Sequence, residues 1–133
     1  MSITLDQYFI GRKHTAQQAS NATDLLIAVN SLLAHYSIDE GVELPTNPHT
    51  GTLISGQTEG GFRLPDCPQG APNSSHKEAK AVDVYDPSDD LDTYLNDEIL
   101  TRYNLYREAP SATLGWCHLT TRAPGSKHRT FLP

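Results

Sequence analysis

The strongest structural signal in the chain is an apolar stripe with helical spacing near the N-terminus. Apolar side chains recur at i, i+1, i+4, i+7, i+8 and i+11, at Leu25, Leu26, Val29, Leu32, Leu33 and Tyr36. This period places all of them on one face of an α-helix. Thr15 and Gln18 have the spacing of a capping box, which favours a helix start at that point. The sequence therefore predicts a helix over residues 15–36 that supplies much of the core.

Proline and glycine limit what the next part of the chain can form. They interrupt residues 37–73 so often that only short strands fit between them, at 52–55 and 61–63. Further strands are expected at Ala81–Tyr85, Trp116–Thr120 and Thr130–Leu132. Short helices are expected from Thr4 to near Gly11 and again from Pro87. These elements predict the α+β class, with a small antiparallel sheet and flanking helices.

Length and charge exclude several classes of function. The 133 residues suit a single domain, 1–133. A net charge of −6 argues against a nucleic-acid partner, and we interpret the basic residues Arg122, Lys127 and Arg129 as a solvated surface. No run is long enough to span a membrane, and the N-terminus lacks a signal-peptide pattern. We expect a monomer that is made in the cytoplasm and does not bind membranes.

The two cysteines, Cys67 and Cys117, form no C-x-x-C pair, so neither a thiolate zinc site nor a redox motif is predicted. Two free thiols or one disulfide both fit the sequence, and free thiols are favoured. Cys117 alternates along its strand with Trp116 and His118, so we expect its side chain to face the core.

The stretch SSHKEAKAVDVYD places a histidine in a loop and an aspartate in the strand that follows. Alternation with the neighbouring valines turns Asp83 away from the core and into a cleft beside the loop that carries His76. In the later phrase GWCHL, His118 projects from a second strand. Two histidine nitrogens and one carboxylate oxygen are a usual ligand set for a catalytic zinc, whose fourth position is left for water.

Spacing alone does not establish such a site, and it narrowly favours a structural interpretation. In that interpretation His76 is a loop residue, Asp83 is a paired strand carboxylate and His118 is half buried. The identity of the surrounding residues shifts the balance toward a metal site.

The segment from Ser74 to Asp83 resembles the S-x-H-x-x-G-x-A-x-D signature of the zinc D-Ala-D-Ala peptidases. Those enzymes form one metallopeptidase superfamily with lysostaphin and the Hedgehog amino-terminal domain. The serine, histidine, alanine and aspartate match in register, whereas Ala79 stands in place of the glycine. Alanine is small enough for a close approach, but a positive φ at that position would be strained. The chain as a whole looks like small phage-encoded members, which begin with a DQYF-type helix and end with a GWCH strand and a Pro-Gly-rich tail.

The resemblance implies a Hedgehog/DD-peptidase-like fold around a zinc cleft. It implies one zinc per chain, held by His76, Asp83 and His118. It also places an arginine in a G-[YF]-R phrase, which Arg63 fits; its guanidinium would hold the scissile carbonyl oxygen or a peptide carboxylate. A surface arginine is the alternative. Ser74 is counted among the substrate-binding residues and is expected to shape the loop through a backbone hydrogen bond.

One departure from the family concerns the general base. The family usually has an acid three residues before the second zinc histidine, and Gly115 stands there. The nearest upstream acid is Glu108, ten residues before His118, and a loop containing Pro110 would allow it to fold back over the metal. We therefore expect Glu108 to act as the catalytic acid and base. An exposed glutamate paired with an arginine is the alternative.

These residues together predict a zinc metallopeptidase of the D-Ala-D-Ala carboxypeptidase or endopeptidase type. Its partners would be peptidoglycan stem or cross-bridge peptides, and its role would be phage lysis, as an endolysin or a virion component. It would reach the cell wall after release from the cytoplasm or as part of a virion. Two alternatives remain open: a non-catalytic zinc-stabilised structural or wall-binding module, and a cytoplasmic peptidase or amidase that acts on small D-amino-acid peptides.

Overall fold

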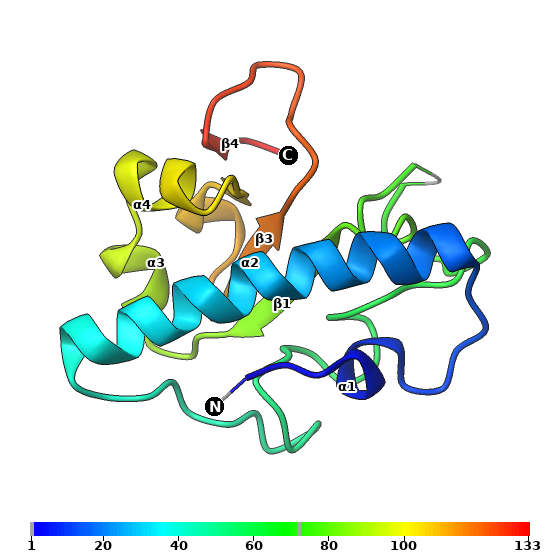
Figure 1. Ribbon diagram of the computed structural model, residues 1–133, viewed down its shortest axis with the longest axis horizontal. Helices are drawn as coiled ribbons and strands as arrows, with labels where there is room; N and C mark the ends of the chain where they lie inside the picture. Colours follow the sequence, from blue (N-terminus) through cyan, green and yellow to red (C-terminus); the bar gives the residue numbers. More distant parts are fainter. Residues whose placement is uncertain (1, 72) are drawn as a thin grey trace.

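The computed structural model describes residues 2–71 and 73–133 of the protein. In these residues the helices are α1 (Leu5–Phe9), α2 (Ala16–Glu40), α3 (Asp90–Tyr94) and α4 (Asp97–Arg102), and a 3₁₀ turn covers Pro110–Ala112. The strands are β1 (Ala81–Tyr85), β2 (Tyr106–Glu108), β3 (Trp116–Thr120) and β4 (Thr130–Phe131). The α+β class is therefore as expected (Figure 1). None of the described helices has the length and apolar character needed to cross a membrane.

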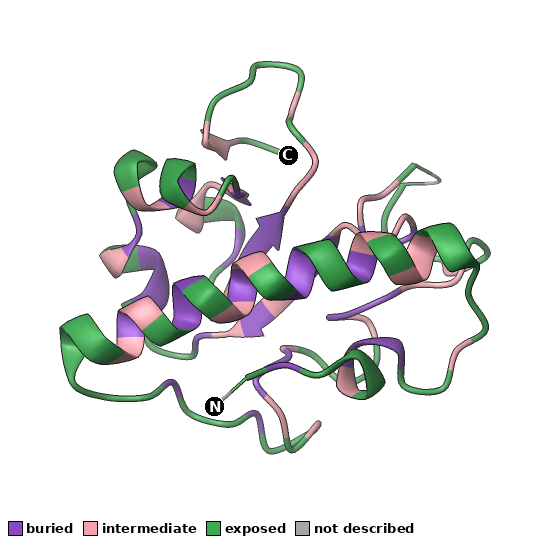
Figure 2. Ribbon diagram, in the orientation of Figure 1, coloured by how far each residue is buried: buried purple, intermediate pink, exposed green. Residues whose placement is uncertain are grey.

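The long helix α2 forms as the sequence predicts and lies across the sheet (Figure 1). Thr15 and Gln18 make the reciprocal capping box at its start, and all six residues of the apolar stripe are buried. Figure 2 shows this as buried bands that alternate with exposed ones along the helix. The helix runs four residues past the predicted end, to Glu40, because no breaker occurs before Gly41, which closes it in a left-handed conformation.

The short helix α1 ties the N-terminus to the strand that carries Asp83. Its start at the Thr4 capping box is confirmed, and it ends one turn later with Ile10 in a left-handed conformation. The buried Tyr8 hydroxyl donates a hydrogen bond to the Ala81 carbonyl oxygen at 2.8 Å. The Tyr8 carbonyl oxygen accepts one from the Phe62 N–H at 3.1 Å. Helix α1 thus holds both β1 and the segment that leads to Arg63.

The four strands form one mixed sheet in the order β1-β3-β2-β4, which corrects the expectation of an antiparallel sheet. β1, β3 and β2 pair antiparallel, but β4 runs parallel to β2. The reason lies in the connection after β3. The segment 121–129 returns the chain antiparallel to β3, as a hairpin would, but β2 lies between the two strands, so β4 pairs with the far edge of β2.

The two short strands expected in the proline-rich region do not form as strands. At 52–55 a single bridge joins Ile54 to Val84 at the free edge of β1. At 61–63 the backbone instead packs directly on the backbone of α1: a Cβ added at Gly61 would lie 2.5 Å from the Tyr8 carbonyl oxygen. Glycine permits this approach, and the Gly60 carbonyl oxygen accepts a hydrogen bond from Asp83 N–H at 2.7 Å.

The single helix expected from Pro87 is replaced by two short helices. α3 ends at Tyr94, because Leu95 adopts an extended conformation. The Asn96 side chain then accepts a hydrogen bond from the Ile99 N–H and starts α4. Leu91 and Leu95 are both buried, so the apolar face of the predicted helix survives the break.

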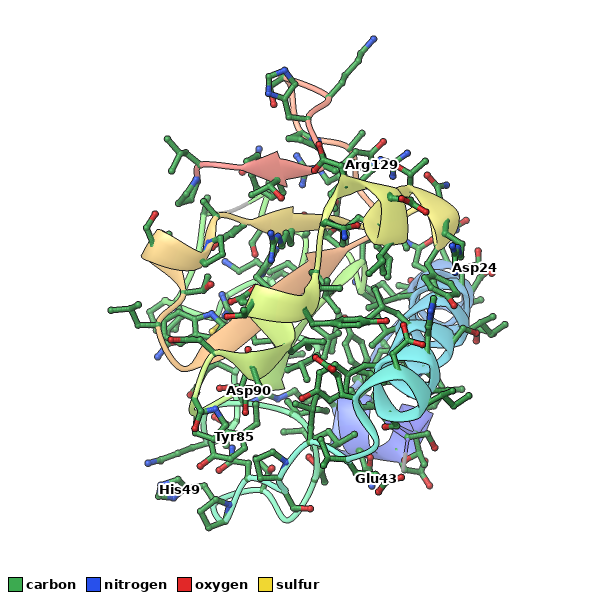
Figure 3. All side chains as sticks on the ribbon, turned by 90° about the vertical axis from the view of Figure 1, so that its left-hand side faces the viewer. Asp24, Glu43, His49, Tyr85, Asp90 and Arg129 are labelled. Atoms are coloured by element: carbon green, nitrogen blue, oxygen red, sulfur yellow. The ribbon has the colours of Figure 1, made fainter. Side chains whose placement is uncertain are left out.

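The short strand β2 was not predicted. It has only three residues, and contacts of its side chains stabilise its position. Arg107 donates from Nη1 to the Asp92 carbonyl oxygen at 2.6 Å and to Asp92 Oδ1 at 3.2 Å, and from Nε to Thr130 Oγ1 at 3.0 Å. Arg129 stacks over the Tyr106 ring at 4.3 Å, so it is not the solvated cation that its sequence context indicated. Figure 3 shows Arg129 beside β2 and β4, at the opposite end of the molecule from His49.

Replacement of Arg107 with alanine is expected to lower the free energy of unfolding by about 3–5 kcal/mol, because it leaves the carboxylate of Asp92 buried without its cation. The two side chains are only 10% and 1% exposed. The matched control is Arg102→Ala, which removes the ion pair between Arg102 and Glu98. These two side chains are 52% and 83% exposed, so the free energy of unfolding should fall by less than about 1 kcal/mol. Urea unfolding of both variants measures the difference. Equal losses would show that the Arg107 pair is not a buried anchor.

Candidate metal centre

The three residues singled out in the sequence meet over the middle of the strand pair β1–β3. Asp83 of β1 is the direct register partner of His118 of β3, so their side chains share one face of the sheet. His76 comes from the turn that precedes β1. Asp83 Oδ1 lies 3.2 Å from His76 Nε2 and 2.9 Å from His118 Nδ1. The structure thus brings one carboxylate oxygen and two imidazole nitrogens to a single point.

The spacing of these atoms fits a tetrahedral zinc ion. With zinc bonds of about 2.0–2.1 Å, neighbouring ligand atoms of a tetrahedron lie about 3.3 Å apart. The two distances to Asp83 Oδ1 are close to this value, and the three candidate ligand atoms all lie within 4.8 Å of one another. His76 Nδ1 lies 2.9 Å from the Gly61 carbonyl oxygen, which leaves Nε2 facing the carboxylate. Metal-ligating histidines usually donate their second N–H to such a partner.

The charges around Asp83 favour its ionised form. Burial by itself would raise the pKa of this carboxyl, but the charge of His76 and the hydrogen bonds from both histidines outweigh burial and hold the pKa well below its usual range. Burial also opposes the charged form of His118, but the hydrogen bond and charge of Asp83 prevail and raise the pKa of that imidazole. Arg63 Nη2 adds a positive charge 3.5 Å from Asp83 Oδ2. Asp83 is therefore held as the anion that a metal ligand must be.

The turn that carries His76 contains the strain expected from its sequence. Ala79 has φ of +59° and is fully buried, in the position where the family signature has glycine. A left-handed conformation costs a non-glycine residue roughly 1–2 kcal/mol. Hydrogen bonds from Lys77 N to Ser74 O at 3.0 Å and from Lys80 N to Ser75 O at 2.9 Å hold the turn. The Ala79 methyl group packs into the core cluster, which offsets part of the cost.

Glu108, at the end of β2, points toward the three-residue cluster. Its Oε1 lies 3.9 Å from His118 Nε2, on the side of the ring away from Asp83, and its side chain is 24% exposed. Gly115, in the usual place of the family acid, has φ of +89° and forms the turn into β3, where its N–H donates to Asp89 Oδ1 at 3.0 Å. Backbone conformation accounts for the glycine. Glu108, and not residue 115, thus brings a carboxylate from outside the ligand set to the cluster.

Arg63 and Ser74 also lie beside the cluster. The Arg63 side chain is 13% exposed and donates from Nε to the Glu59 carbonyl oxygen at 2.7 Å, so it is not a surface arginine. A Cβ added at Gly70 would lie 2.9 Å from Arg63 Nη1, so this glycine makes room for the guanidinium. Ser74 Oγ accepts a hydrogen bond from the His76 N–H at 3.3 Å, the loop-shaping contact predicted for it.

These residues line one cleft with a volume of about 570 Å³. That size lies within the range usual for small-ligand sites. Sequence reasoning missed three of its lining residues, Trp116, Arg122 and Phe131. Alternation along β3 was a signal for Trp116, because it places that side chain on the same face as His118. Arg122 is not the free surface cation that the sequence indicated, because its guanidinium donates hydrogen bonds to Asn73 and Glu78 at the wall of the cleft.

A second group of acids also lies close together: Asp86, Asp89 and Asp92. Their carboxylates already accept hydrogen bonds from backbone N–H groups and from Arg107. Asp86 accepts hydrogen bonds from two N–H groups at the start of α3, at Leu91 and Asp92. These contacts explain the acids as caps and anchors. The thiols of Cys67 and Cys117 are both free, as favoured from the sequence, and Cys117 is buried in the core.

Comparison of the chain with protein-family models, with curated proteins and with solved structures gives no match. The functional argument therefore rests on the geometry of the cleft and on the motif.

Proposed function

We propose that the protein is a zinc-dependent peptidase that hydrolyses peptidoglycan stem or cross-bridge peptides, with a Hedgehog/DD-peptidase-like arrangement around its zinc cleft. The observation that carries the proposal is the meeting of His76 Nε2, Asp83 Oδ1 and His118 Nδ1 at ligand distances inside a cleft. A carboxylate and a guanidinium from outside the ligand set, those of Glu108 and Arg63, line the same cleft. These two groups supply the proton acceptor and the oxyanion donor that peptide hydrolysis needs beside the metal ligands.

The residues of the cleft divide the chemistry of peptide hydrolysis among them. A zinc ion, when bound, polarises a carbonyl group and lowers the pKa of bound water to about 7. Glu108 Oε1 accepts a proton as water oxygen bonds to the carbonyl carbon, and it returns that proton to the amine nitrogen as the C–N bond breaks. Arg63 donates hydrogen bonds to the carbonyl oxygen as negative charge develops on it. No other cofactor is needed for this exchange.

The substrate class comes from the resemblance of the Ser74–Asp83 segment to the D-Ala-D-Ala peptidases. On that basis the partners are peptidoglycan peptides that contain D-amino acids. The biological role would be cell-wall degradation in phage lysis, by a monomer that reaches the wall after release from the cytoplasm or within a virion. The rival proposal is a zinc-stabilised module without activity, and its support is Gly115, which stands where the family has its general base. The position of Glu108 beside His118 weakens that argument.

Metal removal provides the primary test. The purified protein is expected to contain one zinc per chain and to release amines from purified peptidoglycan. A chelator should abolish that release, and added zinc should restore it. Elemental analysis and an amine assay on the same sample measure both properties. One zinc without amine release would support the binding module, whereas a protein that retains no zinc after its addition would contradict the metal centre itself.

A further inference from the structure

The cleft extends to both sides of His118 along strand β3. Trp116 precedes His118 by two residues and Arg122 follows it by four, and both line the same cleft. The register shows the direction: Trp116 pairs with Tyr85, His118 with Asp83 and Thr120 with Ala81. At a rise of about 3.3 Å per residue, Thr120 lies about 7 Å from His118, and Arg122 lies farther along the chain. A peptide that crosses the metal centre along β3 would therefore meet an aromatic side chain at one end and a cation at the other.

Arg122 is held at the cleft wall by contacts to one edge of its guanidinium. Nη1 donates to the Asn73 carbonyl oxygen and, at 3.0 Å, to Glu78 Oε2. Both partners belong to the turn that carries His76. In the part of the chain that the structure describes, these guanidinium contacts both use Nη1, and the side chain is 38% exposed. The tether fixes the position of the side chain, and Nε and Nη2 form the edge that a carboxylate binds with two hydrogen bonds.

The charge of the cleft differs from that of the whole protein. The chain carries a net charge of −6, which would repel anions at long range. In and beside the cleft, however, Arg63 and Arg122 offset two of three carboxylates, those of Asp83, Glu108 and Glu78, the last of which pairs with Arg122. A bound divalent cation would leave the cleft positive. An anionic group on the substrate would therefore find its favourable site inside the cleft and not on the rest of the surface.

We propose that Arg122 forms an anion subsite that selects peptides carrying a carboxylate two to four residues from the bond positioned at His118. This inference rests on the proposed peptidase function for the bond that is cut, but the subsite can be tested by binding alone. The preferred substrates would then be acidic peptides. They would contact Trp116 on one side of the metal centre and Arg122 on the other.

The test uses pairs of synthetic peptides that contain D-Ala-D-Ala and differ only in a glutamate or a glutamine, placed two, three or four residues from the scissile bond. For at least one placement, kcat/KM of the zinc-loaded protein should be about tenfold higher for the glutamate peptide. Arg122→Gln should reduce the ratio of kcat/KM for the glutamate peptide to kcat/KM for the glutamine peptide to about one, and Arg122→Lys should retain part of the preference. The matched control is Arg102→Gln, which removes an ion-paired arginine outside the cleft and should leave the preference intact.

A second measurement separates failure of the subsite from failure of the peptidase. Trp116 is the only tryptophan of the chain, so its fluorescence reports peptide binding in the zinc-loaded Glu108→Gln variant. The Kd for the glutamate peptide should rise about tenfold when Arg122→Gln is added to that variant. If the Glu108→Gln variant shows the binding preference but the protein with Glu108 intact hydrolyses neither peptide, the subsite stands and the peptidase proposal falls. If the two peptides bind and react equally, or if Arg122→Gln weakens both equally, the subsite is overturned whether or not hydrolysis occurs.

Discussion

Replacement of His76 with alanine is expected to remove both zinc and activity. His76 contributes one of three candidate ligand atoms, and removal of even a supporting outer group costs a metal site about 10- to 100-fold in affinity. Loss of a ligand should therefore weaken zinc binding by at least about 100-fold. Amine release from peptidoglycan should fall to background, because no ion remains to activate water. Elemental analysis after dialysis and the amine assay measure the two effects.

His76 is buried and hydrogen-bonded to the Gly61 carbonyl oxygen, so removal of its side chain also affects packing. A second variant is therefore needed. Asp83→Asn keeps the shape of the side chain but removes its charge, and it should also lose zinc. His128→Ala is the matched control, because His128 is exposed in the tail and lies outside the cluster. Circular dichroism of each variant confirms that the fold is kept. Full zinc content in a folded His76→Ala or Asp83→Asn protein would contradict the ligand assignment.

The parts of the site that could be predicted from the sequence depend on local periodicity. The stripe of α2 follows the helical period, and alternation in β1 and β3 turns Asp83 and His118 to the same face as soon as the strands pair. His76 lies close because only a short turn separates it from β1. These inferences needed no knowledge of the tertiary structure beyond the pairing of two strands.

The parts that escaped prediction depend on contacts between distant segments. β2 has three residues, too few to show a period, and it is fixed by its pairing with β3 and β4 and by the Arg107–Asp92 pair. Arg122 resembled a surface residue because the turn that receives its guanidinium lies more than forty positions earlier in the chain. The expected strand at 61–63 failed because the sequence gives no sign of the backbone that packs against Gly60 and Gly61.

The contact between Glu108 and His118 allows two distinct roles for the carboxylate. If His118 binds the metal through Nδ1, its Nε2 carries the proton, and Glu108 Oε1 lies 3.9 Å from that nitrogen. A carboxylate in this position orients a metal-ligating imidazole, and its loss lowers metal affinity about 10- to 100-fold. A general base has a different signature, because its loss lowers kcat about 10²- to 10⁴-fold and leaves the metal in place.

Glu108→Gln is expected to retain one zinc per chain and to lose about 10²- to 10⁴-fold in kcat, because the amide keeps the shape of the side chain but cannot accept a proton at the same oxygen. Zinc titration and kcat measured on the same preparation separate the two roles. The matched control is Glu98→Gln on α4, whose side chain is 83% exposed and does not line the cleft. A large loss of zinc affinity with an unchanged kcat at saturating zinc would make Glu108 a positioning residue. The proton acceptor would then have to be sought elsewhere in the cleft, whose other carboxylate, that of Asp83, is already a candidate ligand.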